Sequence, residues 1–467
     1  MKKLIAIALV LVLTVASLAG CGAKPAETTN PAPAPSESKP QEETPTEAAT
    51  EPAVSTTFWT DSQQLEEGLR AAVDAFSSEH PSYTISVEAF PGSERSEKLA
   101  FAKEGNTLPS LFLTAFFTSA DEVHQGTILP VTDVVNQYYS DQISDVTLST
   151  VKVQDDYYQV PVYTSSQGFL YNADMFKAAG LEAYVPEDPN EIACWKLEDF
   201  DQVILPALKD YLSGSEKYVM TLYAANNQND SYLHNLLKMY DGNIFTDGYC
   251  TAGDDGNVIK AMEKLKEWHQ AGYTNADVNT RLWTDCNADF RNQSCAISAG
   301  QFASYKNHIA AFESGNAEKF DVRIAAIPCE KADGTNTGVM HTYTYGFALM
   351  NVDEQQVAVA KQFLAWLSEH ALEYIPAMNS GVPAMENVAQ ALSAENPLFL
   401  SYKDAEKYLF DFTGGAPGWV ATRAVFYPEI QAVISGEKTA QQALMDYETA
   451  ANEIITEYTE NSIVLNQ

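Results

Sequence analysis

The chain has 467 residues, of which 45% are hydrophobic and 11% aromatic, and its formal net charge is −35 at pH 7. This length and composition are typical of a globular protein with more than one domain. The large excess of acidic groups argues against nucleic acid or anionic lipid as a direct partner, because both would repel such a surface.

The first 21 residues have the features of an export signal. Two lysines, Lys2 and Lys3, precede an apolar run over residues 4–15, which is too short to cross a bilayer as a stable helix. Residues 18–21 read Leu-Ala-Gly-Cys and resemble a bacterial lipobox, the signal for cleavage before a cysteine and lipidation of its thiol. We therefore expect a signal peptide over residues 1–20 and a lipid on Cys21; the alternative is an ordinary signal peptide that ends near a cysteine.

Residues 21–55 are predicted to form a disordered tether after the lipidated cysteine. Residues 22–55 contain seven prolines and no aromatic residue. Such a segment cannot bury enough apolar surface to offset the entropy of ordering it. An extended tether of this length spans on the order of 100 Å, so the folded part should stand away from the extracellular face of the bacterial membrane that anchors it.

The folded part begins with an alternation of strands and helices. A strand over residues 56–60 precedes an amphipathic helix whose apolar positions are Leu65, Leu69, Val73 and Phe76. A strand over 83–89, a helix over 93–103 and an apolar strand over 111–113 follow. This order predicts an α/β sheet with mostly parallel strands.

The segment from residue 155 to residue 181 reads as a strand, a polar step, a second strand and a short helix. The strands are expected at residues 158–162 and 169–171, with Thr-Ser-Ser-Gln at 164–167 between them. After this segment the pattern becomes more helical. Helices are expected over 195–212, 231–239, 257–268 and 356–367 and at the end of the chain from Thr439, and strands over 320–327 and 345–350.

The sequence contains none of the common catalytic motifs, and we expect no enzyme activity, no cofactor and no metal site. Residues 285–289 resemble the start of a calcium-binding loop but lack the glycine and the glutamate that such a loop needs later on. Five cysteines follow Cys21, and an odd number leaves at least one free thiol in an exported protein. Cys286 and Cys295 are close enough in sequence to pair, although the sequence does not decide whether they do.

Several short stretches follow one another along the chain in a recognisable order. They are Phe-Trp-Thr at 58–60, Glu-His-Pro-Ser-Tyr at 79–83, the passage 99–112, Leu-Pro-Val-Thr-Asp at 129–133, the passage 157–181, residues 320–328 and Ser-Gly-Glu-Lys-Thr at 435–439 with Ala-Leu at 443–444. In this order they resemble the family 1 extracellular solute-binding proteins of ABC importers, the class that includes maltose-binding protein. The similarity covers nearly all of residues 56–467.

Three stretches depart from the family pattern. Cys194 replaces the usual threonine before Trp195, residues 292–297 lose a glycine, and Tyr-Thr-Tyr-Gly at 343–346 replaces a frequent Gly-Gly. The last change lies where members of the family usually bind their ligand, so it bears on the choice of solute.

The resemblance implies a periplasmic-binding-protein-like fold of two α/β lobes that are joined by hinge crossings and enclose a ligand cleft. The N-terminal lobe is expected to comprise residues 56–163 plus 328–377, and the C-terminal lobe residues 164–327 plus 378–467. The crossings are expected at 164–167, where the backbone should bend, near 327–329 and within 376–383. By this resemblance the protein is a monomer that captures a carbohydrate, in particular an oligosaccharide, and delivers it to the permease subunits of an ABC importer.

The ligand-binding candidates are aromatic and polar residues in positions expected to face the cleft, because sugars stack on rings and bond to planar polar groups. Trp59 and Trp419 are expected to approach the solute from opposite lobes. For any single candidate, packing in a core is an equally good interpretation, and Arg423 could form a surface ion pair instead. The candidates are Trp59, Thr60, Tyr163, Tyr223, Asn227, Trp283, Phe302, Tyr343, Trp419 and Arg423.

Two other functions stay open at the level of sequence. The same fold could bind a polyamine, a phosphorylated polyol, a peptide or a metal chelate. An anchored extracellular glycan-processing enzyme would use paired carboxylates, but no motif places two of the many acidic residues together.

Overall fold

The computed structural model describes residues 53–466; the predicted signal peptide, Cys21 and almost all of the predicted tether lie outside this range. Its first elements are β1 (Val54–Thr60), α1 (Glu66–Glu79), β2 (Tyr83–Ala89), α2 (Arg95–Gly105) and β3 (Leu111–Ala115). β1 pairs in parallel with both β2 and β3. The predicted parallel pairing is therefore confirmed for these first strands, whereas the sheet as a whole is mixed, because β14 and β7 pair antiparallel with their neighbours. α1 buries Leu69, Val73 and Phe76 as its periodicity indicates.

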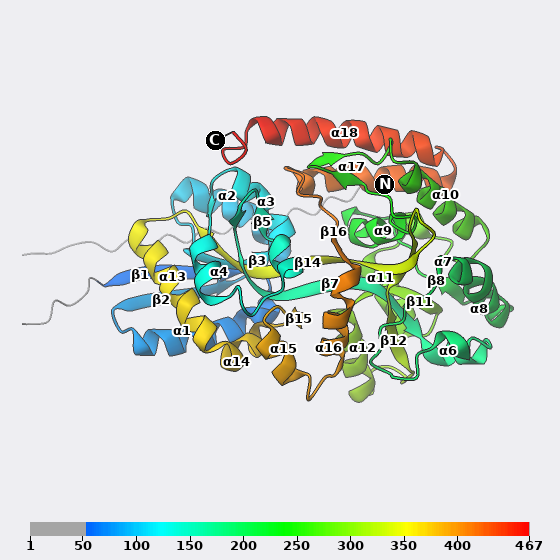
Figure 1. The fold of residues 1–467 in the computed structure, drawn as a ribbon, viewed down its shortest axis with the longest axis horizontal. Coiled ribbons are helices and arrows are strands. Elements are labelled where there is room, and N and C mark those ends of the chain that lie inside the picture. The colour runs from blue at the N-terminus through cyan, green and yellow to red at the C-terminus, as the bar shows by residue number, and fades with distance from the viewer. Residues whose placement is uncertain (1–52, 467) are drawn as a thin grey trace, which may run out of the picture. The chain divides into compact units, whose positions relative to one another are not determined.

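Two long antiparallel strands form the centre of the main sheet. β7 (Val160–Asn172) and β14 (Asn336–Met350) pair with each other through residues 160–167 and 341–347. The strand order is β2-β1-β3-β14-β7-β11-β8, with β11 at Cys295–Gln301 and β8 at Tyr218–Met220 (Figure 1). β12 (Val322–Ala325) also pairs with β7.

β7 differs from the sequence prediction of two strands separated by a bend. Its residues 164–167 are buried and continue the strand, with Thr164 opposite Thr344 and Gln167 opposite His341. One of these polar side chains bonds to the neighbouring strand: the Ser166 hydroxyl donates a hydrogen bond to Thr342 Oγ1 at 3.3 Å. The irregularity lies on β7: Tyr345 of β14 pairs with Tyr163 and Gly346 pairs with Pro161, so Val162 is an extra residue in β7.

The second predicted crossing, at 327–329, coincides with the start of a short strand. β13 (Ile327–Glu330) folds back on the first part of β14 as a hairpin, so β14 itself carries the chain alongside β7. The third predicted crossing contains β15 (Val382–Pro383), which pairs with Tyr163 and Thr164 of β7.

The buried apolar side chains form separate cores on the two halves of the sheet. One core contains Phe58, Phe76 and Phe363, and another contains Phe169 and Trp268. Trp195 and Trp366 are also buried in these two cores. The division of the chain into two lobes at the expected boundaries stays a prediction.

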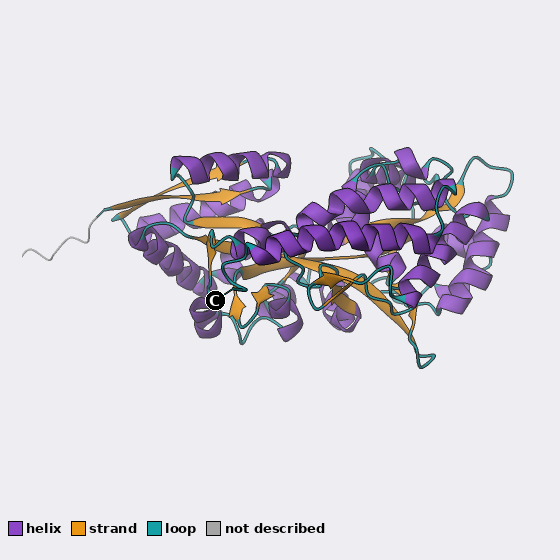
Figure 2. Ribbon diagram, turned by 90° about the horizontal axis from the view of Figure 1, so that it is seen from above, coloured by secondary structure: helices purple, strands orange, loops and turns teal. Residues whose placement is uncertain are grey.

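Helices cover the sheet, and two of the longest close the chain. α17 (Trp419–Ser435) and α18 (Ala440–Glu460) lie side by side (Figures 1 and 2). Thr439 caps α18 as predicted, since its hydroxyl accepts a hydrogen bond from the Gln442 N–H at 3.1 Å. The other helices of eight or more residues are α3 (Phe116–His124), α8 (Leu205–Leu212), α9 (Asp230–Leu237), α10 (Gly256–Gln270), α11 (Trp283–Arg291), α12 (Phe302–Glu313) and α13 (Glu354–Glu369).

The shorter elements connect these helices and strands. The short strands are β4 (Ile128–Leu129), β5 (Lys152–Val153), β6 (Asp156–Tyr157), β9 (Phe245–Thr246), β10 (Tyr249–Cys250) and β16 (Leu409–Asp411). The short helices are α4 (Thr132–Tyr138), α5 (Asp145–Ser149), α6 (Ala173–Ala178), α7 (Leu197–Asp199), α14 (Ala371–Tyr374), α15 (Glu386–Leu392) and α16 (Leu398–Asp404).

Three further observations concern residues 53–466 as a whole. No helix in this range has the length and apolar character needed to cross a bilayer. No cluster of histidine, cysteine and acidic side chains in this range could hold a metal ion. All five cysteines in this range, including Cys286 and Cys295, are free thiols.

Candidate functional site

A cleft of about 230 Å³ lies where α3, α9, β14 and α17 meet. Ligand sites in α/β proteins lie beyond strand ends, and Gln301 at the end of β11 is one of the lining residues. The lining residues are Phe117, Gln167, Tyr223, Gln228, Asp230, Ser231, Trp283, Gln301, Tyr343, Phe412, Trp419 and Arg423.

Four of these residues form an aromatic wall, which we define as Phe117, Tyr343, Phe412 and Trp419. The ring centroid of Phe117 lies 5.0 Å from that of Tyr343 and 5.7 Å from that of Trp419. Phe412 lies 4.9 Å from Trp419 and 5.9 Å from Phe117. The aromatic wall thus brings together rings from α3, β14, α17 and the segment before α17.

Arg423 and Asp230 are the charged side chains among the residues that line the cleft. The Arg423 guanidinium bonds to both oxygens of Asp230, with Nη2 to Oδ1 at 3.2 Å, and Nη2 also donates to the Asn227 carbonyl at 3.3 Å. The Asp230 side chain is only 2% exposed. Because the two charges compensate each other, the lining carries no net charge.

Some polar groups of the cleft are buried without a hydrogen-bond partner. They are Gln167 Oε1, an acceptor, and Trp419 Nε1, a donor. Unpaired buried polar groups are rare in folded proteins and often mark a place where a ligand or water completes the bond. Burial also raises the pKa of the Tyr223 and Tyr343 phenols, so both stay neutral and able to donate.

Half of the residues predicted from the sequence are brought together in this cleft. They are Tyr223, Trp283, Tyr343, Trp419 and Arg423. Asn227 does not line the cleft, but its backbone carbonyl helps to hold Arg423. Whether any of these side chains contacts a solute stays a prediction.

The structure places Trp59 in a core and not in the cleft, which corrects the expectation that it faces Trp419. Trp59 is 6% exposed and packs edge-to-face against Phe90 at 5.4 Å and Phe112 at 6.0 Å. The reason is that helices cover both faces of the parallel sheet, so Phe58 and Trp59, on opposite faces of β1, are both buried.

Three other candidates also lie away from the cleft lining. Phe302 is fully buried against Phe399 at 4.9 Å, and Thr60 is fully buried, with its hydroxyl accepting from the Ser62 N–H at 3.2 Å. Tyr163 stacks on Tyr345 at 4.8 Å. Its hydroxyl accepts a hydrogen bond from Ser380 at 2.8 Å, so it ties β7 to the chain before β15.

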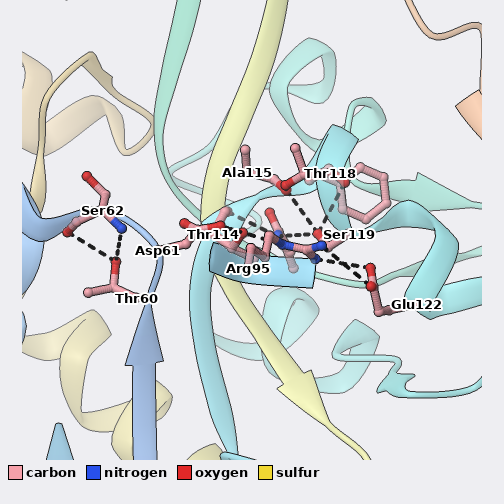
Figure 3. Close-up of polar contacts among 11 residues, drawn as sticks. Thr60, Asp61, Ser62, Arg95, Thr114, Ala115, Thr118, Ser119 and Glu122 are labelled. Atoms are coloured by element: carbon pink, nitrogen blue, oxygen red, sulfur yellow. Dashed lines mark hydrogen bonds and ion pairs between the residues drawn. The ribbon is translucent and has the colours of Figure 1, made fainter. Parts of the chain in front are cut away.

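The ends of β1 and β3 hold the start of α3 in place through a polar network (Figure 3). Thr114 donates to Asp61 Oδ2 at 2.6 Å, and Arg95 Nη2 pairs with Glu122 at 3.0 Å while its Nε lies 3.5 Å from Asp61. Ser119 donates to the Ala115 carbonyl at 3.0 Å. Burial raises the pKa of Asp61, although Thr114 and Arg95 oppose this rise. The network fixes the helix that presents Phe117.

Sequence reasoning missed several lining residues, above all Phe117. The signal for Phe117 was available, because it follows the predicted strand 111–113 at the carboxyl end of a parallel sheet. The signal for Gln167 was obscured, because a buried glutamine inside a strand resembles ordinary sheet pairing. The other missed residues are Gln228, Asp230, Ser231, Gln301 and Phe412.

A larger cavity of about 460 Å³ lies beside the start of β1. Most of its lining residues are serine, threonine, asparagine and glutamine, and none is aromatic. None of the unpaired buried side-chain atoms among residues 53–466 belongs to this lining. The smaller cleft is therefore the stronger candidate for a binding site.

Known proteins resemble the chain in sequence and in fold. A binding protein of Brucella abortus strain 2308 is 24% identical over 210 residues, which are 44% of this chain and 47% of the relative; the match thus spans about half the length of that curated relative. The sugar-binding protein MalE from Xanthomonas citri has a TM-score of 0.70 at 16% identity, covering 89% of this chain and all of that one. The cyclic α-maltosyl-1,6-maltose binding protein from Arthrobacter globiformis has a TM-score of 0.69 at 16% identity, covering 87% and 100%.

These structural similarities confirm the fold class expected from the sequence, a two-lobed binding-protein fold. The model of the family described as bacterial extracellular solute-binding protein matches residues 60–372, about two thirds of the chain. The chain therefore belongs to the bacterial extracellular solute-binding protein family.

Proposed function

We propose that the protein captures an uncharged carbohydrate in the cleft that the aromatic wall lines. It then delivers this carbohydrate to the permease subunits of an ABC importer. The observation that carries this proposal is the composition of the cleft: aromatic rings that pack edge-to-face or tilted, neutral amides and phenols, and no net charge. Membership of a solute-binding family also confirms that the protein is not an enzyme.

The aromatic residues suit the faces of sugar rings. Trp283 and Tyr343 are both half-buried, so part of each ring remains accessible from the cleft. Flat rings that are already held by their neighbours give large contact areas at small entropic cost. The amides of Gln167 and Gln301 lie among these rings and offer both donors and acceptors to hydroxyl groups.

The pairing of Arg423 with Asp230 favours the binding of a neutral solute over that of a charged one. A phosphorylated polyol would need Arg423 as its partner, and a polyamine would need Asp230. Taking either one out of its pair would leave the other charge buried and uncompensated, which costs about 3–5 kcal/mol. A solute without net charge avoids this cost.

The structural relatives also support a sugar. One is described as a sugar-binding protein, and the other binds cyclic α-maltosyl-1,6-maltose. Their identity to this chain is too low to transfer a particular solute, and the proposal therefore specifies the class and not the compound.

We further propose that the protein is a monomer anchored to the extracellular face of the cell membrane through Cys21, which lies outside the described residues. The lipobox-like sequence and the proline-rich segment after it support the anchor. Cell fractionation tests it: Cys21→Ser should release the protein from the membrane fraction, whereas retention of the variant would contradict the anchor.

A thermal-shift screen tests the proposed solute class. The screen uses an anchor-free form, residues 22–467, with neutral mono- and oligosaccharides, sugar phosphates, polyamines and short peptides. Neutral sugars should raise the melting temperature, because a ligand that binds only the folded state stabilises it. A shift produced only by phosphates, amines or peptides would contradict the proposal.

A further inference from the structure

The aromatic wall separates two cavities. The cleft of about 230 Å³ lies on one side, and a second cavity of about 40 Å³ lies on the other. Both cavities are lined by Phe117, Tyr343, Phe412 and Trp419, so these four rings are their common partition.

The lining of the second cavity is rich in hydroxyl groups. They belong to Ser149, Thr150, Thr342, Thr344 and Thr413, and the Thr150 and Thr344 hydroxyls are bonded to each other at 2.5 Å. This chemistry fits a hydroxylated molecule better than a lipid. A volume of about 40 Å³ holds about one water molecule, so the second cavity has no room for a sugar ring as it stands.

Phe117 is the half-buried ring of the partition that a helix carries, and it contacts the other three rings. Trp419 and Phe412 are only 2% and 4% exposed, and Tyr343 belongs to the central strand β14. Phe117 is half-buried and is the second residue of α3, whose backbone is held by the network at the ends of β1 and β3. The ring, and not the helix, therefore decides whether the two cavities connect.

We propose that Phe117 is a specificity-determining residue that limits the length of the solute, by closing the cleft against the second cavity. The inference rests on the proposed carbohydrate function and narrows it. The cleft volume lies below the roughly 300–1,000 Å³ of sites for drug-sized ligands. The solute class that fits is a mono- or disaccharide, shorter than the oligosaccharide suggested by the family resemblance.

Isothermal titration calorimetry with oligosaccharides of increasing length tests whether Phe117 limits the length of the solute. The probes are malto- and cello-oligosaccharides of one to five units, and the proteins are the anchor-free wild type, Phe117→Ala and Phe101→Ala. Phe101 is a matched control because it is 63% exposed on α2 and lines neither cavity. Wild type and control should bind the short members at least tenfold more tightly than the members with four or five units.

In Phe117→Ala, the ratio of long-chain to short-chain dissociation constants should fall at least tenfold, because the space of the lost phenyl ring joins the second cavity and together they give the longer chain room beyond the cleft. The inference is overturned if the wild type binds long and short members equally, or if the variant keeps the wild-type ratio. Phe117→Leu is the second variant, should the alanine variant fail to fold.

A crystal structure of unliganded Phe117→Ala separates this inference from the proposed function. If no sugar binds any of the proteins, the carbohydrate assignment fails, but the partition can still be examined. The variant should then show one continuous cavity bounded by both sets of lining residues. Two separate cavities would overturn the role of Phe117 whatever the solute is.

Discussion

At the scale of single residues, the environment of a tryptophan decides whether it contributes to the stability of the fold alone or to ligand binding as well. Trp59 packs against Phe90 and Phe112, with the Lys98 ammonium 5.5 Å from its ring. Trp419 is equally buried, but its Nε1 has no partner and its ring borders the cleft. The first residue should therefore affect stability alone, while the second should affect binding as well.

Trp59→Ala should lower the free energy of unfolding by about 3–5 kcal/mol, because it leaves a cavity in a core that cannot fully collapse. Denaturant unfolding followed by circular dichroism measures this loss. The folded fraction of the variant should bind solute as wild type does. A loss below about 1 kcal/mol would show that Trp59 is not a core residue.

Two buried histidines should make stability depend on pH. Burial lowers the pKa of His234 to about 4 and that of His341 to about 3, below the unfolded value of about 6.5. The unfolded chain therefore binds protons first as the pH falls. The stabilisation from neutral histidines is complete above pH 6.5 and should decrease below it by about 1.4 kcal/mol per pH unit for each histidine until about pH 4.

Denaturant midpoints between pH 7 and pH 4 measure this dependence. His234→Gln is the informative variant, since the amide can still donate to the Phe412 carbonyl, which His234 Nδ1 contacts at 3.1 Å, but does not titrate. The variant should lose stability less steeply than wild type. An unchanged slope would show that His234 does not contribute.

At the scale of elements, periodicity was a good guide to helices and a poor guide to the central strands. The apolar stripe of α1 and the cap of α18 are local features, so the sequence predicts both. In β7, the polar residues 164–167 looked like a bend. The Ser166 hydroxyl bonds to Thr342 of β14, which lies 176 residues away in the chain, and no local pattern shows such a partner.

Only part of the candidate site could be predicted from the sequence, because the rest depends on contacts between residues that are far apart in the chain. Aromatic residues near glycine-rich turns, such as Trp419, stand out in a sequence. The pairing of Arg423 with Asp230 joins residues 193 positions apart, and only the fold reveals it. The burial of Trp59 likewise depends on helices on both faces of the sheet, which residues 56–60 do not show.

The contact of β15 with β7 requires a glycine at position 381. A Cβ atom there would lie 2.2 Å from the Thr164 carbonyl oxygen and 2.5 Å from a ring carbon of Tyr163. Gly381→Ala should therefore destabilise the protein by about 1–3 kcal/mol, because one of the two strands must shift. Thermal unfolding measures the effect.

Gly256→Ala is the matched control, because a Cβ atom at the start of α10 would meet nothing within 4 Å and the glycine has no positive φ. This control should be neutral or slightly stabilising. Equal melting temperatures for the two variants would contradict the close approach at Gly381.

At the scale of the whole molecule, the segments around α17 and α18 contact α3 across the cleft. The Gly418 N–H donates to Asp121 at 2.8 Å, and the Ile463 N–H donates to the His124 carbonyl at 2.9 Å. His124 Nδ1 also lies 3.0 Å from the Ser462 hydroxyl. A solute that touches both α3 and α17 adds to these contacts only when the two sides are together.

Solute binding should therefore draw the two sides of the cleft together, since a ligand favours the conformation in which it makes more contacts. The hinge should lie near Thr164 and Ser380, where β15 and the chain before it meet β7. Small-angle scattering of the anchor-free form, with and without a solute from the thermal-shift screen, should show a smaller radius of gyration at saturation. An unchanged radius would contradict closure on binding.

The most direct test of the central claim, that solute binds at the aromatic wall, is an isothermal titration of that solute against Trp419→Phe and Trp59→Phe. Both variants keep an aromatic ring, but only the first removes an indole N–H that borders the cleft. Loss of one hydrogen bond and part of the stacking surface should weaken binding by Trp419→Phe about tenfold, while Trp59→Phe should bind as wild type does. Wild-type affinity in Trp419→Phe together with weakened binding in Trp59→Phe would contradict the assignment.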